Sequence, residues 1–213
     1  MIRIQKYLFG LLLGLALATA WSASAQALPP IREFYFDTDA AAAPIVLVDP
    51  AQADAVDQLA RQRSRGRRAV EASVQLADIA AAEGRLELAD TLYQEALAAA
   101  PANSMLGRGV RWNMGWHAFR QGRHEQAQQL WLQALEQVRG EPSWAPPTLA
   151  LVLHRQGNTD EAVKWYAAAV RTEPQLWIDP ANFERLLPHW QPAERQALEQ
   201  VHQAWVASPP SWP

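Results

Sequence analysis

From about residue 51 onward, small and bulky hydrophobic residues recur at helical spacing along the chain. In the segment 86–100, Ala89, Tyr93 and Ala96 follow one another at intervals of four and three residues, which places them on one face of a helix. The same order of small, bulky and small residues returns three more times. The four sets are Ala89-Tyr93-Ala96, Ala127-Trp131-Ala134, Ala162-Tyr166-Ala169 and Ala197-Val201-Ala204. The pattern predicts four helices that approach their neighbours closely through the small residues.

Turn-forming residues stand at fixed positions around these helices. Five residues before the leading alanine the first three sets have glycine and the fourth has proline: Gly84, Gly122, Gly157 and Pro192. Glycine adopts the left-handed backbone that ends a helix at little cost, so each glycine indicates a preceding helix. That helix carries a packing pair in each of the first three sets: Leu76-Ala77, Met114-Gly115 and Leu149-Ala150. The leading alanines are 38, 35 and 35 residues apart, which indicates a repeated helix–turn–helix unit.

This arrangement resembles the tetratricopeptide repeat, a helix–turn–helix unit of about 34 residues. The resemblance covers residues 70–174 in full and reaches residue 209 for the second helix of a degenerate fourth unit. It implies an all-α fold, a right-handed superhelix (α-solenoid) of three helix pairs, because each pair buries its apolar face by stacking on the next. We expect an N-terminal helix at 51–69, a degenerate repeat with a capping helix at 175–207, and a disordered tail at 208–213.

The first 25 residues have the pattern of a cleaved secretory signal. Arg3 and Lys6 precede an apolar run at residues 7–20, and small residues follow at positions 23–25. Cleavage is expected after Ala25 or after Ala27. The run is short for a transmembrane helix, and without cysteine the chain has no lipid-attachment site. The sequence therefore predicts export by the general secretory route to the periplasm of a Gram-negative bacterium, or secretion, without a stable membrane span.

Residues 26–50 differ in composition from the repeats. Prolines bound two short hydrophobic stretches, at 34–36 and 45–48, which suit extended segments. Because an isolated hairpin is only marginally stable, this segment has to lie on another part of the chain. We interpret it as an extended N-terminal arm.

The net charge and the missing motifs argue against nucleic-acid binding, catalysis and metal binding. The net charge is −3, which disfavours nucleic acid as a partner. The basic run at 61–68 predicts a solvated helix face, with an anion site as the lesser alternative. The chain has no phosphate-binding loop and no hydrolase motif. Its five histidines show no metal-ligand spacing. We therefore expect no catalytic residue, no metal site and no cofactor, and a protein that is not an enzyme.

Ten tryptophans are more than a chain of this length usually has. Trp131, Trp165 and Trp205 occupy packing positions of second helices, where a core role is expected. In the tetratricopeptide repeat family the first helices line a concave groove, and the resemblance implies a peptide-binding groove at the matching positions. These are Trp112, Asn113, Trp116, Phe119 and Arg120 in the second unit, and Trp144, Thr148, Leu151, His154 and Arg155 in the third. Asn113 matches one residue of a carboxylate clamp found in some relatives, whereas other clamp positions differ, so that clamp is not predicted.

The sequence does not decide what covers these aromatic groove residues. Three possibilities stay open: another part of the chain, either the arm at residues 31–48 or the C-terminal helix; an external ligand; or a second copy of the chain in a homodimer. The function expected from the resemblance is that of a non-catalytic adaptor that binds a protein or peptide partner of unknown identity. The alternatives are a glycan or cell-wall binder acting through exposed tryptophans, and an accessory subunit of an envelope assembly.

Overall fold

The computed structural model describes residues 27–32, 37–138 and 140–211. The predicted signal segment 1–25 and the hydrophobic stretch 34–36 lie outside the described residues. Within them, the regular elements are all helical. The helices are α1 (Ala55–Arg65), α2 (Ala69–Ala82), α3 (Leu86–Ala99), α4 (Met105–Arg120), α5 (His124–Leu135), α6 (Ala145–Arg155), α7 (Thr159–Thr172), α8 (Pro174–Trp177), the 3₁₀ turn η1 (Pro180–Asn182), α9 (Phe183–Leu186) and α10 (Pro192–Ala207).

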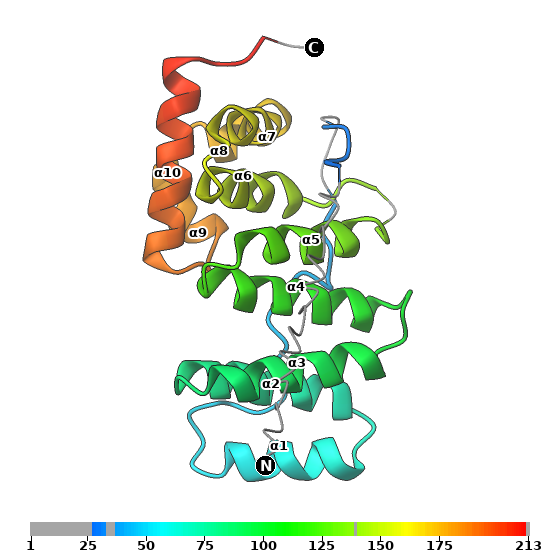
Figure 1. The fold of residues 1–213 in the computed structure, drawn as a ribbon. Coiled ribbons are helices and arrows are strands. Elements are labelled where there is room, and N and C mark those ends of the chain that lie inside the picture. The colour runs from blue at the N-terminus through cyan, green and yellow to red at the C-terminus, as the bar shows by residue number, and fades with distance from the viewer. Residues whose placement is uncertain (1–26, 33–36, 139, 212–213) are drawn as a thin grey trace, which may run out of the picture.

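Three helix pairs, α2 with α3, α4 with α5 and α6 with α7, stack one on another along a single direction (Figure 1). The predicted α-solenoid of three helix pairs is therefore confirmed. Each pair turns at a glycine with a left-handed backbone: φ is +75° at Gly84, +73° at Gly122 and +82° at Gly157. The predicted small and bulky positions are the centre of the core, since Ala89, Tyr93 and their counterparts in the next two units have no exposed surface or almost none.

Different elements close the two ends of the stack. Helix α1, shorter than the predicted 51–69, packs on α2. At the other end, α10 stands across α6 and α7 (Figure 1) and buries Leu198 and Val201 completely. The degenerate fourth unit has no long first helix; α8, η1 and α9 replace it with short turns, while α10 is the expected capping helix. No helix in the described part of the chain is long and apolar enough to span a membrane.

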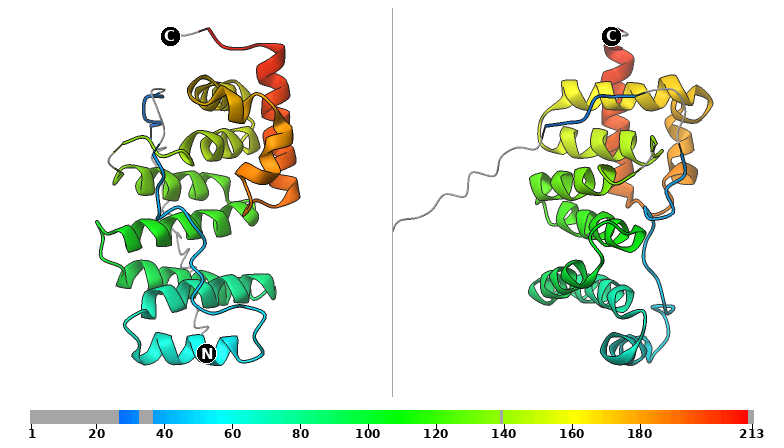
Figure 2. Two further views of the ribbon diagram at one scale, coloured as in Figure 1. Left: turned by 180° about the vertical axis from the view of Figure 1, so that it is seen from behind. Right: turned by 90° about the vertical axis from the view of Figure 1, so that its right-hand side faces the viewer.

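The arm has an extended course along one side of the stack. Residues 37–54 run lengthwise from the level of α6 down to α1, after which the helices return in the opposite direction (Figure 2). Near its start the arm forms a β-bridge with the loop before α6: Asp37 N–H donates to the carbonyl oxygen of Glu141 at 2.7 Å, and Ser143 N–H donates to that of Asp37 at 2.9 Å. The arm is thus attached at both ends.

Candidate functional site: the first-helix groove

Two buried carboxamides on the first helices bind the backbone of the arm. Asn113 of α4 donates to the carbonyl oxygen of Ala43 at 3.0 Å and accepts from Ile45 N–H at 3.3 Å. Gln75 of α2 accepts from Leu47 N–H at 2.7 Å and from Val48 N–H at 3.1 Å, and donates back to the Val48 carbonyl. Because the hydrogen bonds given by both side chains go to backbone groups, they recognise an extended chain rather than particular side chains.

An ion pair fixes the arm between α4 and α6. The Asp39 carboxylate accepts from the Arg108 guanidinium at 2.8 Å and from the Trp144 indole N–H at 3.1 Å. Its Oδ1 also accepts from Ala41 N–H at 3.0 Å, which shapes the turn of the arm at this point. Only 6% of the Asp39 side chain is exposed. A carboxylate so far removed from water needs these three donors. The two that belong to the stack, Arg108 and Trp144, determine where the arm crosses the groove.

The arm approaches α4 closely where that helix has a glycine. A Cβ atom at Gly109 would lie 3.4 Å from the Ala41 carbonyl oxygen and 3.6 Å from the Ile45 side chain. Ala42 and Ile45 in turn pack against the hydrophobic core of the stack. The sequence left three possible occupants of the groove. The structure shows the first of them, because residues 37–48 of the arm cover α2, α4 and the start of α6.

The aromatic stripe of α4 is covered from another direction. Trp112, Trp116 and Phe119 are buried, with 5–6% of each side chain exposed. The Trp116 ring lies 5.0 Å from that of Trp190, which precedes α10, and 5.0 Å from that of Trp131 beneath it. Every described tryptophan is buried or half-buried, so the expectation of exposed tryptophans as a stacking platform does not match the described part of the chain.

Arg120 joins the end of α4 to the capping helix. Its guanidinium lies 5.3 Å from the Trp116 ring centroid and donates to Glu194 at 2.9 Å. Glu194 also accepts from the backbone N–H of Gln191, the residue that caps α10. The Glu194 side chain is only 4% exposed, and the arginine compensates its charge.

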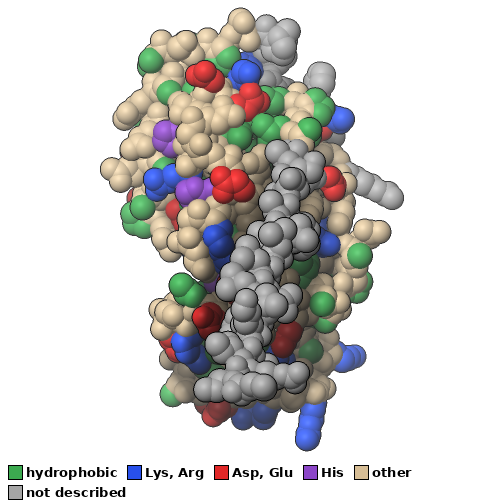
Figure 3. Space-filling view, viewed as in Figure 1, with side chains coloured by type: hydrophobic (Ala, Val, Ile, Leu, Met, Phe, Trp, Pro, Cys, Tyr) green, Lys and Arg blue, Asp and Glu red, His purple; other side chains and the backbone are tan. Residues whose placement is uncertain are grey.

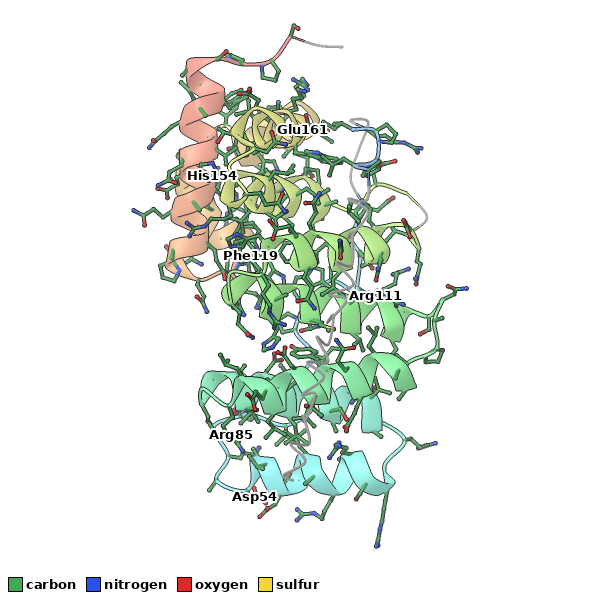
Figure 4. All side chains as sticks on the ribbon, viewed as in Figure 1. Asp54, Arg85, Arg111, Phe119, His154 and Glu161 are labelled. Carbon is green, nitrogen blue, oxygen red and sulfur yellow. The ribbon has the colours of Figure 1, made fainter. Side chains whose placement is uncertain are left out.

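In the third unit the predicted residues divide between two surroundings. Trp144 contacts the arm, and Thr148 and Leu151 are buried on α6. His154, further along α6, lies beside α10 (Figure 4) with a ring nitrogen 3.0 Å from Gln200 Oε1. Arg155 is exposed at the end of α6. The structure thus places eight of the ten predicted groove residues on the part of α4 and α6 that faces the arm and the segment before α10, and His154 and Arg155 at the capping end.

Two of the cavities beside the arm are lined by predicted groove residues. The first, which we call the aromatic cavity, has a volume of about 320 Å³ and lies among the arm, α4, α6 and the segment 173–190. The second, the polar cavity, has a volume of about 340 Å³ and lies between α2 and the second half of α4. Both are lined by Trp112 and His189.

Asp78 is the most perturbed carboxyl group of the polar cavity. It accepts from the Tyr93 hydroxyl at 2.5 Å. The Asp78 side chain lines the polar cavity and is partly open to solvent. The loss of surrounding water in this cavity raises the pKa of Asp78 to about 6. The Tyr93 hydrogen bond and the Arg120 charge act in the opposite direction and lower the pKa. Burial also lowers the pKa of nearby His117, whose Nε2 lies 2.9 Å from Asp90.

Three residues that attach the arm to the stack were not predicted from the sequence. Gln75 and Arg108 lie on the helices, and Asp39 lies on the arm. The available signal was weak, a single glutamine in an otherwise apolar run at 74–77. The basic run at 61–68 extends from α1 to the start of α2. Arg63 pairs with Glu95 and Arg68 with Glu71, and the face in Figure 3 shows basic and acidic side chains interspersed at the α1 end. No cluster of three potential metal ligands occurs among the described residues.

Comparison with family models identifies the repeats. Two models described as tetratricopeptide repeat match the chain: one covers residues 70–103, the region of α2 and α3, and the other covers residues 113–176, from the second half of α4 into α8. No match was found among curated proteins or solved structures. Repeats of this family generally mediate protein–protein interaction, and the fold is typically a non-catalytic scaffold. The matched segments and the stacked helix pairs show that the chain contains tetratricopeptide repeats.

Proposed function

We propose that the protein is a non-catalytic periplasmic adaptor whose first-helix groove binds an extended segment of a protein partner, and that its own arm takes this place in the absence of the partner. The observation that carries the proposal is the pair Gln75 and Asn113. Both carboxamides are buried and both bind peptide backbone groups of an extended chain. A groove that recognises backbone accepts a second extended segment with the same chemistry as the arm.

A partner has to compete with the arm for the groove. As a tethered ligand it competes at an effective concentration on the order of millimolar. A partner segment therefore has to match the carboxylate of Asp39 and the aliphatic residues near Ile45 to replace it. This supports an adaptor that stays closed until a suitable segment is present.

The test uses a variant in which residues 38–48 are replaced by a Gly-Ser linker of equal length, with helicity checked by circular dichroism. A fluorescently labelled synthetic peptide of residues 37–50 is expected to bind this variant and not the wild-type protein. Adding Gln75→Ala and Asn113→Ala to the linker variant should weaken peptide binding at least tenfold, the effect of about two hydrogen bonds. Fluorescence anisotropy gives the affinities.

Co-purification then connects the groove to a partner. The linker variant should retain more of one periplasmic protein than the wild type does, and the synthetic arm peptide should displace it. If the peptide binds the linker variant but no protein is retained more strongly, the groove serves only the arm. If the peptide does not bind at all, the groove does not hold segments supplied from outside.

Export is a separate part of the proposal and rests on the leader pattern of residues 1–25. The full chain, expressed in a Gram-negative host, should be recovered from the periplasmic fraction with a mature N-terminus at Gln26 or Leu28, the residues that follow the two expected cleavage points. Recovery of an intact N-terminus from the cytoplasm would contradict it.

A further inference from the structure

Helix α1, which closes one end of the stack, is held by few buried side chains. Of its eleven residues, two are buried, Ala55 and Leu59, and Leu59 has no exposed surface. The ion pair between Arg63 and Glu95 of α3 joins two exposed side chains, and such pairs add little stability. A helix of this length is only marginally stable in water by itself. The place of α1 in the fold therefore depends on how its two ends are attached.

Helix α2, on which α1 packs, also holds the end of the arm. Gln75 of α2 accepts from the N–H groups of Leu47 and Val48 at 2.7 and 3.1 Å. Helix α1 begins at Ala55, seven positions after Val48, and Figure 2 shows the arm reaching the level of α1 just before that helix begins. The N-terminal end of α1 is thus attached to α2 through the arm, and its C-terminal end through the short loop at 66–68.

The connection between the arm and α1 is a hydrogen-bonded turn. Asp49 Oδ1 accepts from Ala51 N–H at 2.9 Å, and the Asp49 carbonyl oxygen accepts from Gln52 N–H at 3.1 Å. The Gln52 carbonyl oxygen accepts from Ala55 N–H at 3.1 Å, and the Gln52 side chain accepts from that of Gln58 at 3.1 Å. These bonds follow one another without a break from the arm into α1, so a displacement of the arm is passed on to the helix.

We infer that the arm and α1 are coupled, so that release of the arm from the groove loosens α1 from α2 and uncovers that end of the stack. With the arm in place, α1 is fixed at both ends. With the arm released, it is attached at its C-terminal end alone, and a helix with two buried side chains then opens more readily. The coupling is a property of the chain itself, and only its use by a partner rests on the proposed function.

The test measures hydrogen exchange of the full chain by NMR in the variant in which residues 38–48 are a Gly-Ser linker. Helices α1 and α2 and the turn between the arm and α1 keep their sequence in this variant, so it does not alter α1 directly. The amides of residues 59–65 should exchange at least about fivefold faster than in the wild type. The last turn of α10, at the opposite end of the stack (Figure 1), is the internal control and should keep its exchange rate. Unchanged exchange in α1 would overturn the proposal.

The synthetic peptide of residues 37–50 separates coupling through the chain from an effect of groove occupancy. Added to the Gly-Ser variant, the peptide refills the groove but is not joined to α1, so exchange in α1 should stay fast. If the peptide restores the slow exchange of α1, the filled groove rather than the connection stabilises that helix, and the proposal is wrong. If the peptide does not bind, the proposed function fails, while the comparison of the variant with the wild type still tests the coupling.

Coupling also has to act in the reverse direction. Leu59→Ala removes the buried anchor of α1, and the amides of Leu47 and Val48 should then exchange about fivefold faster. Val56→Ala is the matched control on the same helix, because Val56 is 44% exposed, and it should leave these two amides unchanged. If Leu59→Ala accelerates exchange in α1 and leaves that of Leu47 and Val48 as in the wild type, the arm and α1 move independently and the inference does not hold.

Discussion

The side-chain amide of Asn113 donates a hydrogen bond of 3.0 Å to the carbonyl oxygen of Ala43, 70 positions earlier in the chain. A groove residue of the second repeat thus binds the backbone of the arm as it would bind a separate peptide. The same side chain donates at 2.8 Å to the carbonyl of Gly109 in its own helix, which fixes its orientation toward the arm. The arm is therefore held by a preformed site.

Removing either carboxamide should loosen the arm. Gln75→Ala and Asn113→Ala each leave backbone groups of the arm without a partner, so each should lower the free energy of unfolding by about 1–3 kcal/mol in urea denaturation. Hydrogen exchange at Leu47 and Val48 should accelerate in Gln75→Ala. The control Gln196→Ala, at an exposed position of α10, should change stability by less than about 0.5 kcal/mol. Unchanged exchange at Leu47 in Gln75→Ala would show that this hydrogen bond does not hold the arm.

Asp39 should be the most sensitive residue of the arm. In Asp39→Ala the Arg108 guanidinium and the Trp144 indole lose a shared, nearly buried acceptor, so we expect a loss of about 2–4 kcal/mol. Trp144→Phe removes one of these bonds and should cost less. Because the two residues are in contact, the double variant should cost less than the sum of the single ones, which a thermodynamic cycle of urea denaturation measures. Strict additivity would mean that the indole contributes nothing through Asp39.

The repeats were predictable from sequence because their signal is local and repeated. Small residues at Ala89 and Ala96, and a glycine at Gly84, each carry a physical requirement that recurs at a fixed interval. The first-helix positions could be predicted in the same way, through the resemblance. Their surroundings could not, because the contacts that bury Trp116 come from Trp190, far along the chain, and no periodicity relates the two.

The docking of the arm was equally beyond sequence patterns. Asp39 binds Arg108, which lies 69 positions later in the chain. The sequence around each of these residues looks like that of an ordinary solvent-exposed charge. Gln75 is a polar residue in an apolar helix, and the sequence does not indicate what it binds. Its partners are backbone groups, which are the same at every position and so leave no pattern in the sequence. The short turns of α8 and α9 lie in the segment that was expected to be a degenerate repeat, where Pro180 and Pro188 prevent a longer helix.

Stability should respond to pH through Asp78. Its pKa is raised to about 6 in the folded protein, against an ordinary value of 3.8. Between these two pH values the folded state keeps a proton that the unfolded chain has released, so the contribution of Asp78 to stability falls as pH rises from about 4 to about 6 and stays low above that. In Asp78→Asn the group no longer titrates, while the amide oxygen still accepts from Tyr93.

The variant Asp78→Asn should therefore gain stability relative to the wild type as pH rises. Urea denaturation of both proteins from about pH 4 to about pH 8 measures this difference, and other titrating groups cancel because both proteins share them. The difference should increase through about pH 5 to 6 and level off near about pH 7. A difference that is constant with pH would contradict the raised pKa.

Two glycines of α4 offer a contrast that separates helix propensity from packing. Alanine is favoured over glycine inside a helix by about 1 kcal/mol, so both Gly109→Ala and Gly115→Ala gain this amount from propensity alone. A Cβ atom at Gly115 would lie 2.3 Å from the indole nitrogen of Trp131, which has no exposed surface, whereas one at Gly109 meets the arm at 3.4 Å or more.

Gly115→Ala should consequently lower the free energy of unfolding by about 1–3 kcal/mol, because the buried indole cannot move aside without disturbing both helices of the repeat. Gly109→Ala should stay within about 1 kcal/mol of the wild type. The Trp131 indole donates to the Trp112 carbonyl at 3.2 Å, so its displacement in Gly115→Ala should also shift its ¹H–¹⁵N resonance. Equal stability of the two variants would mean that Trp131 yields freely, and that glycine at position 115 is not required for the approach of α4 to α5.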